Sequence, residues 1–190
     1  SADVVIRMPT GAGVGAGPFH SQSTEAWFFH TPGLKIVYPS NPQDAKGLLL
    51  AALEDPNPYL FFEHKYLYRS LSGEVPEGYY TTEVGQGAVV EDGHDLTIVT
   101  YGLGVLWAQE IAAELEASIE IVDLRTLAPW DRELVESSVR KTSRAVVLHE
   151  DTLIGGVGAE IAAWVSEHCF TYLDAPVKRV ASLDTPVPFA

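Results

Sequence analysis

Short apolar runs rich in β-branched residues alternate along this chain with longer stretches of helical period. The runs predict strands at Val4–Met8, Leu34–Tyr38, Tyr59–Glu63, Leu96–Tyr101, Ile119–Leu124, Ala145–His149 and Val177–Ala181. The stretches between them predict helices at Thr24–His30, Pro42–Glu54, Leu103–Leu115, Asp131–Lys141 and Ala159–Cys169. This alternation is typical of an α/β fold with a mainly parallel sheet.

Two of the predicted helices carry recognisable start signals. Asn41 stands directly before Pro42, and Asp131 follows Trp130. Asn and Asp side chains accept hydrogen bonds from the free N–H groups of a helix's first turn, and proline is well tolerated at the first helical position. We therefore expect helices to begin at these two points.

The periodic pattern lapses between Ser70 and Thr82, where turn-forming residues dominate. We place a linker at residues 71–82, between a first segment of residues 1–70 and a second of residues 83–190. A segment of about 70 residues is marginal for an independent core, whereas about 110 residues form a comfortable domain. The first predicted strand starts three residues from the beginning, and Pro186–Ala190 has no helical closure, so we expect both ends to be cut from a longer protein.

Composition narrows the range of partners. The chain has 26 acidic and 12 basic residues, a formal charge of −14, and an ordinary 46% of hydrophobic residues. A strongly acidic protein is a poor ligand for a phosphate backbone, so we expect no nucleic-acid partner. No apolar run approaches the roughly 20 residues that span a bilayer, and the single cysteine, Cys169, forms no internal disulfide. These features predict a soluble, cytoplasmic protein without a membrane partner.

A glycine arm that leads to His20 is the strongest candidate for chemistry. Four glycines occur between Gly11 and Gly17, and the histidine follows three residues later, next to a predicted helix start. Glycine allows close approach and unusual dihedral angles, and imidazole exchanges protons near neutral pH. The residues alone leave a catalytic histidine and a simple turn equally open. Ser23, Thr24 and Glu25 suit the first turn of the helix that follows.

Three other features have structural explanations that the pattern favours or leaves open. The turn at Glu54–Pro58 is most simply a helix stop, although its oxygens could hold a hard cation. His149 and Glu150 end a strand, where ligands bind in parallel sheets. The glycines of Gly155–Gly158 could bind an anion, but close packing of the loop is the preferred interpretation. The remaining histidines show no metal-binding spacing.

Blocks of residues along nearly the whole chain resemble the beta subunits of thiamine-diphosphate-dependent 2-oxo acid dehydrogenases. In family order they are His20–Trp27, Pro32–Pro42, Asp44–Leu50, Phe61–Arg69, Val122–Asp131, Gly155–Ile161 and Leu173–Val180. The blocks Phe61–Arg69, His149–Glu150 and Asp184–Pro186 are most similar to the branched-chain, 2-oxoisovalerate type.

The resemblance implies a fold and an assembly. Residues 1–70 would be the C-terminal half of a transketolase-type pyrimidine-binding domain, and residues 83–190 a transketolase C-terminal-type domain with a mainly parallel mixed sheet. The family forms heterotetramers of two alpha and two beta subunits and acts on a lipoyl transacylase core. By resemblance, the half domain lacks the glutamate that activates the cofactor, the usual C-terminal extension is missing, and the fragment alone is inactive.

The resemblance also assigns residues. His20 aligns with the active-site histidine, which acts as a proton donor or an electrostatic partner to substrate. Ala52, Asp55 and Asn57 align with residues whose backbone carbonyls hold a potassium ion. Thiamine diphosphate would be shared with the alpha subunit, which holds its Mg²⁺. The location would be the cytoplasm, or the mitochondrial matrix in a eukaryote.

Two other functions remain open from the sequence. A pyruvate or acetoin dehydrogenase beta subunit would share the same fold. A module that only assembles subunits or docks the transacylase would use the second segment without performing chemistry.

Overall fold

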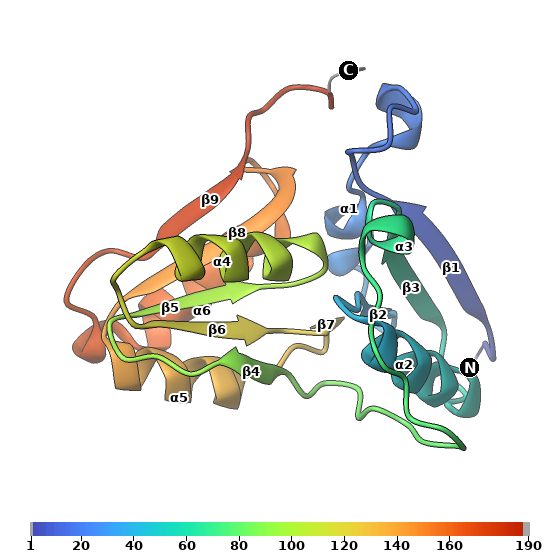
Figure 1. Ribbon diagram of the computed structural model, residues 1–190, viewed down its shortest axis with the longest axis horizontal. Coiled ribbons are helices and arrows are strands. Elements are labelled where there is room, and N and C mark those ends of the chain that lie inside the picture. The colour runs from blue at the N-terminus through green and yellow to red at the C-terminus, as the bar shows by residue number, and fades with distance from the viewer. Residues whose placement is uncertain (1, 188–190) are drawn as a thin grey trace.

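A computed structural model describes residues 2–187, so the last three residues of the predicted unclosed terminus, 188–190, lie outside the described residues. The chain forms two neighbouring β-sheets (Figure 1). The first has the strand order β1-β3-β2-β7. β1 and β2 both run parallel to β3, and β7 is antiparallel to β2. Its strands are β1 Val5–Thr10, β2 Lys35–Val37, β3 Tyr59–His64 and β7 Thr126–Ala128.

The second sheet has the order β4-β6-β5-β8-β9. Only β4 is antiparallel to its neighbour, so the sheet is mainly parallel, as the sequence predicts. Its strands are β4 Ala88–Glu91, β5 Leu96–Thr100, β6 Ile119–Asp123, β8 Ala145–Thr152 and β9 Lys178–Ser182.

Helices connect the strands at the predicted places. They are α1 Glu25–Phe29, α2 Pro42–Glu54, α3 Leu67–Ser70, α4 Leu103–Glu114, α5 Arg132–Thr142 and α6 Val157–His168, with 3₁₀ turns η1 Pro18–His20 and η2 Phe170–Tyr172. The predicted start signals are confirmed, since Asn41 caps α2 through the Asp44 N–H and Asp131 caps α5 through the Leu134 N–H. None of the helices within residues 2–187 is long and apolar enough to cross a membrane.

The sequence prediction missed β4, β7, α3 and both 3₁₀ turns. β7 is the most consequential omission, because it belongs to the second segment in sequence but pairs with β2 of the first. Residues 71–82 contain neither helix nor strand and run along α2 (Figure 1). There Lys46 donates to the carbonyls of Pro76 and Gly78, both at 2.8 Å. The two segments therefore share a sheet as well as a linker.

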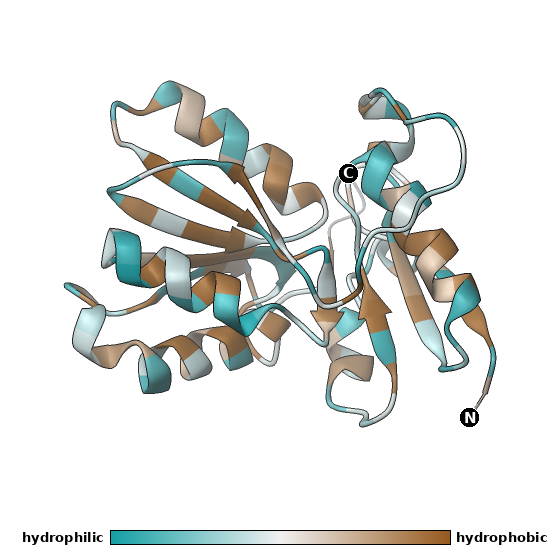
Figure 2. Ribbon diagram, turned by 90° about the horizontal axis from the view of Figure 1, so that it is seen from below, coloured by the Kyte–Doolittle hydropathy of each residue, from teal (hydrophilic) through white to brown (hydrophobic). Residues whose placement is uncertain are grey.

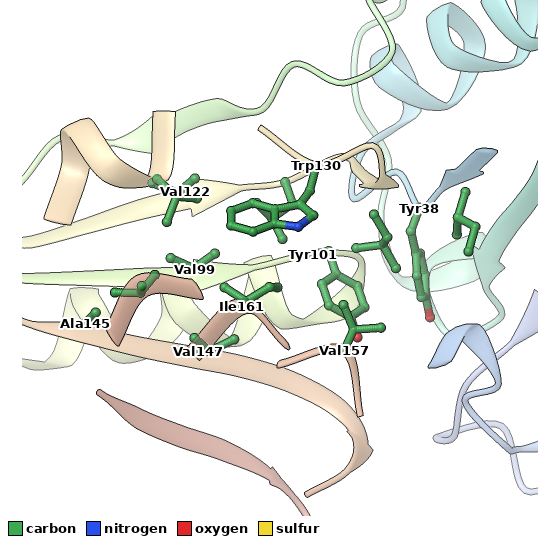
Figure 3. Close-up of a cluster of buried hydrophobic side chains, with 14 of the residues drawn as sticks. Tyr38, Val99, Tyr101, Val122, Trp130, Ala145, Val147, Val157 and Ile161 are labelled. Atoms are coloured by element: carbon green, nitrogen blue, oxygen red, sulfur yellow. The ribbon is translucent and has the colours of Figure 1, made fainter. Parts of the chain in front are cut away.

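One apolar core continues from the first sheet into the second. Tyr38 packs on Phe62 and on Tyr101, with ring centroids 5.7 Å and 5.3 Å apart (Figure 3). Gly102 makes this contact possible, because a Cβ atom there would lie 2.7 Å from the Tyr38 ring. Figure 2 shows hydrophobic residues along the strands, while the helices carry both hydrophobic and hydrophilic residues. The core fixes the two sheets against each other.

The carboxyl ends of strands from both sheets meet in this arrangement. β5 points toward the first sheet (Figure 1), and His64 at the end of β3 contacts Glu150 of β8. Ligands of parallel sheets bind beyond the carboxyl ends of the strands. The polar residues of this junction therefore lie where a parallel sheet binds its ligands.

Candidate functional site

The glycine arm is a loop whose two ends are tied together. The N–H of Gly11 donates to the carbonyl of Gln22 at 3.3 Å, and the Thr10 hydroxyl donates to the same oxygen at 2.7 Å. Gly11, Gly13, Gly15 and Gly17 all have positive φ, between 64° and 90°. Residues with a Cβ avoid this region, which explains why the arm is built from glycine.

The tip of the arm presents His20 to solvent. Pro18–His20 forms the 3₁₀ turn η1, which projects away from the sheets (Figure 1). Phe19 beside it is 94% exposed. Within residues 2–187, the His20 ring has no hydrogen-bond partner, so the structure does not bring it into contact with the polar residues below the arm.

Glu150 collects the polar contacts beneath the arm. It accepts hydrogen bonds from the Ala12 N–H at 3.3 Å, the Ser23 hydroxyl at 2.9 Å and the His64 ring at 2.9 Å. A cavity of about 280 Å³ lies beside it, bordered by Ala12 and Trp107 among others. A larger hollow of about 1280 Å³, between α1, the β7–α5 turn and the start of α6, includes none of these polar residues.

Glu25 forms a second, deeper polar group. It is 1% exposed and accepts a hydrogen bond from the Tyr101 hydroxyl at 2.9 Å, while its other carboxylate oxygen has no partner among the described residues. Burial, together with the negative charge of Asp151, raises the pKa of Glu25 to about 8. This carboxyl group is therefore largely protonated at neutral pH.

His149 lies next to this group and is neutral for the same reason, because burial disfavours the charged form of both side chains. Its ring is stacked on Tyr101 at 6.2 Å, and within residues 2–187 neither ring nitrogen has a hydrogen-bond partner. Burial lowers its pKa to about 4. Gly156 and Gly158 pack on the ring, where added Cβ atoms would lie 2.6 Å and 2.5 Å away. The packing interpretation of this glycine loop is confirmed.

The structure confirms that a helix starts at this point, with Thr24 as the N-cap of α1, but it corrects the expected capping contacts. The sequence predicts that Ser23, Thr24 and Glu25 satisfy the free N–H groups of that helix's first turn. Thr24 is the N-cap residue but makes no side-chain cap hydrogen bond. Ser23 instead donates to Glu150, and the Glu25 carboxylate accepts from Tyr101. These side chains bind distant residues and do not cap the helix, because leaving the buried partner groups on Glu150 and Tyr101 unpaired would cost stability.

The turn after α2 is held by the side chain of Asp55. That carboxylate binds the Lys35 ammonium, accepts from the Asn57 N–H at 3.0 Å, and accepts from the Tyr59 hydroxyl at 2.9 Å. The hydrogen bond from Lys35 holds the pKa of Asp55 well below its usual range. Ala52 is fully buried in the last turn of α2. The side chain of Asp55 is thus fully engaged, which leaves its backbone carbonyl as the group available to a cation.

Sequence reasoning missed the roles of His64, Ser23 and Glu25. The spacing of His64 in the sequence indicates no metal site, and within residues 2–187 no group of three His, Cys, Asp or Glu side chains is arranged to hold a metal. The one available signal was its position at the end of a strand, which is also what singled out Glu150.

Two family models cover nearly the whole chain. "Transketolase, pyrimidine binding domain" matches residues 1–70, and "Transketolase, C-terminal domain" matches residues 85–190. A solved structure of a split-gene transketolase, described as an inactive beta4 tetramer, superposes with a TM-score of 0.78 at 29% identity, covering 95% of this chain and 58% of that one. The predicted α/β transketolase-type fold is confirmed.

Curated relatives are more similar still. The chain is 48% identical to the mitochondrial 2-oxoisovalerate dehydrogenase subunit beta 2 of Arabidopsis thaliana, over 97% of this chain and 52% of the relative. It is 48% identical to the 2-oxoisovalerate dehydrogenase subunit beta of Bacillus subtilis, over 100% and 59%. Identity to the pyruvate dehydrogenase E1 component subunit beta of Mycoplasma genitalium is 42%, over 100% and 59%.

The chain thus spans between half and three fifths of the length of these relatives. The C-terminal-domain model alone accounts for more than half of the chain. The chain therefore belongs to the transketolase family, with residues of both its pyrimidine-binding and its C-terminal domains, and over nearly its whole length it is similar to the beta subunits of 2-oxo acid dehydrogenases.

Proposed function

We propose that this chain is the beta-subunit portion of a branched-chain 2-oxo acid dehydrogenase. The reaction is the oxidative decarboxylation of 2-oxo acids with reductive acylation of a lipoyl group. The observation that carries the proposal is the 48% identity, over at least 97% of the chain, to 2-oxoisovalerate dehydrogenase beta subunits of a plant and a bacterium.

The proposed cofactor is thiamine diphosphate, shared with an alpha subunit that holds the Mg²⁺. When bound, it supplies a nucleophilic carbon and an electron sink for decarboxylation. The chain offers one feature that fits such a site, an exposed imidazole on a glycine arm at the carboxyl edge of a sheet. His20 would hold or donate a proton there, a task that enzymes most often give to an imidazole side chain.

Substitution of His20 tests this role in the full-length beta subunit assembled with its alpha subunit. His20→Ala is expected to lower reductive acylation at least 100-fold while thiamine diphosphate binding, measured by calorimetry, is retained. His94→Ala is the matched control, since His94 is also exposed but lies in the β4–β5 loop. Wild-type acylation by His20→Ala would contradict the assignment.

Substrate choice separates the branched-chain proposal from its main competitor. The 42% identity to a pyruvate dehydrogenase beta subunit favours pyruvate as the second candidate. The kcat/KM of the complex for 3-methyl-2-oxobutanoate is expected to exceed that for pyruvate at least tenfold. The reverse order would assign the chain to the pyruvate type, and an absence of turnover with both, together with binding of a transacylase, would favour a docking module.

A potassium ion is proposed at the turn after α2, held by the backbone carbonyls of Ala52, Asp55 and Asn57. Helix geometry supports this, because the normal i+4 partner of the Ala52 carbonyl is Pro56, which has no N–H. Oxygen ligands suit a hard cation. Replacing K⁺ by Na⁺ at constant ionic strength is expected to lower the Tm of the complex, and equal Tm values would contradict the site.

The proposed partners are an alpha subunit, a second beta subunit and a lipoyl transacylase core. The proposed location is the cytoplasm of a bacterium or the mitochondrial matrix of a eukaryote. Two relatives, from Arabidopsis thaliana and Dictyostelium discoideum, are named as mitochondrial.

A further inference from the structure

Both ends of the glycine arm reach the same carboxylate. At one end, the Ala12 N–H lies 3.3 Å from each oxygen of Glu150, and at the other end the Ser23 hydroxyl donates to Oε2 at 2.9 Å. Glu150 belongs to β8, 138 residues beyond Ala12. Among residues 2–187, every hydrogen bond between the arm, residues 11–23, and the second segment ends on this one side chain.

His64 binds the carboxylate of Glu150. Its Nε2 lies 2.9 Å from Oε2 of Glu150, and its Nδ1 accepts the Tyr66 N–H at 3.3 Å. A neutral ring that accepts at Nδ1 carries its proton on Nε2, so it donates to the carboxylate without needing a positive charge. The side chains of His64 and Glu150 are only 1% and 13% exposed.

The arm also rests directly on this histidine. A Cβ atom at Gly11 would lie 2.1 Å from Nε2 of His64, so only glycine allows the backbone to pass so close to the ring. Gly11 has φ +90°, which separately favours glycine. The base of the arm therefore has two supports, the ring beneath it and the carboxylate that binds its ends.

Glu150 carries a charge suited to this task. Burial by itself raises its pKa, but the hydrogen bond and the charge interaction with His64, together with the hydrogen bonds from Ser23 and Ala12, outweigh burial, and the net shift is downward. A carboxylate that stays ionised makes charge-assisted hydrogen bonds, which are about twice as strong as neutral ones. In contrast, the bonds inside the arm are local and neutral, such as those to the carbonyls of Gly17 and Pro18.

We propose that Glu150, supported by His64, is a positioning residue that fixes the glycine arm to the second segment and thereby sets where His20 stands. The catalytic part of this inference rests on the proposed function of His20. The structural part, that one carboxylate orders the arm, does not depend on that function and is tested without any substrate.

Hydrogen exchange resolved by mass spectrometry, on the full-length beta subunit with its alpha subunit, tests the structural part. Glu150→Ala is expected to speed amide exchange in residues 11–23 at least tenfold, and Ser23→Ala to speed it less because one end stays bound. The matched control is Glu120→Gln, which removes another buried carboxylate of the same sheet, paired with Lys141 near its opposite edge.

The conservative variant His64→Gln, whose amide can take the place of Nε2, is expected to preserve the slow exchange that His64→Ala loses. Unchanged arm exchange in both Glu150→Ala and Ser23→Ala would overturn the proposal. So would a rise that is equal throughout both sheets, because that indicates general destabilisation. If Glu150→Ala does not fold, the amide exchange of residues 11–23 in Ser23→Ala still tests whether Glu150 orders the arm.

A double-mutant comparison tests whether Glu150 acts through His20. Glu150→Ala is expected to lower kcat at least tenfold with less than a threefold change in KM, and to cause no further loss in a His20→Ala background. The same loss in both backgrounds would show that Glu150 acts independently of His20. If His20→Ala alone has wild-type activity, the proposed function fails while the exchange result on the arm still stands.

Discussion

At the scale of single residues, Glu25 is the most unusual side chain of this molecule. Its carboxyl group is buried beside Tyr101, and within residues 2–187 it has no cationic partner. Asp151 and Glu150 add negative charge nearby. The fold accommodates the group by keeping it protonated, so the free energy of unfolding depends on the protonation of Glu25 and hence on pH.

The pKa of Glu25 rises from 4.5 to about 8 on folding, so the folded chain holds a proton that the unfolded chain has lost between these values. Its contribution to stability is complete below pH 4.5 and is lost as the pH rises through 8. Glu25→Gln stays neutral at every pH. The free energy of unfolding of the variant, relative to wild type, is therefore expected to increase by about 2–4 kcal/mol between pH 5 and pH 8.

Urea unfolding of the full-length protein at pH 5, 6.5 and 8 measures this difference. Glu110→Gln, at an exposed position of α4, controls for the substitution itself. A difference between Glu25→Gln and wild type that does not vary with pH would contradict the buried, protonated state.

His149 shifts stability the other way. Its pKa falls from 6.5 to about 4 in the folded chain, so its contribution is complete above pH 6.5 and is lost as the pH falls through 4. Glu25, which accepts a hydrogen bond from Tyr101, and His149, which stacks on Tyr101, thus narrow the pH range of highest stability from opposite sides.

At the scale of elements, local signals decide which parts of the fold can be predicted. Asn41 and Asp131 mark the starts of α2 and α5 because a cap lies within three residues of the N–H it satisfies. β7 has only three residues, Thr126–Ala128, too few to show a period. β4 exists because Val89 pairs with Val122, a partner 33 positions away that no local pattern reveals.

Asp131 also connects two elements, which makes its substitution informative. One carboxylate oxygen accepts the Leu134 N–H at 2.9 Å, and the other accepts the Gly87 N–H at 3.0 Å, at the entry to β4. Asp131→Ala removes the cap and leaves the Gly87 N–H unpaired. We expect a loss of about 1.5–3 kcal/mol in the free energy of unfolding.

Chemical denaturation of the full-length protein measures this loss. The amide of Asp131→Asn has one oxygen, which can accept either the Leu134 N–H or the Gly87 N–H but not both. The free energy of unfolding is therefore expected to fall by less in Asp131→Asn than in Asp131→Ala. Ser137→Ala, exposed on the same helix, is the control and is expected to change stability by less than about 0.5 kcal/mol. If Asp131→Ala lowered the free energy of unfolding no more than Ser137→Ala does, that result would contradict the double role of the Asp131 carboxylate.

At the scale of the whole molecule, the strand β7 joins the two segments, because it follows β6 in the chain and pairs with β2 of the first segment. Leu127 at its centre is fully buried in the core that includes Tyr38 of the first segment and Val122 of the second. Leu127→Ala is expected to cost about 2–5 kcal/mol, since it leaves a cavity where both sheets meet.

Native-state hydrogen exchange shows whether the two segments respond together. In Leu127→Ala, the slowest amides of β3 and those of β5 are expected to lose protection by the same factor. Leu53→Ala, at a 59% exposed position of α2, is the control. Loss confined to one segment would show that the two sheets unfold separately.

The arrangement of the whole molecule explains why the sequence alone does not predict the contacts of Glu150. His149–Glu150 could be singled out as the end of a strand, but the partners of Glu150 lie 86 to 138 residues away. Their meeting follows from the way the two sheets are set against each other by Tyr38 and Tyr101. The assignments of His20, Ala52, Asp55 and Asn57 stay predictions.

The late position of β7 also has a consequence for how the protein is made. β1, β2 and β3 lie within residues 5–64, but β7, which pairs with β2, leaves the ribosome only with residues 126–128. Until then β2 has an unpaired edge, which can capture other extended chains. β2 thus gains its β7 partner only after the first segment has been made, and a nascent chain stalled before residue 126 leaves that edge of β2 without β7.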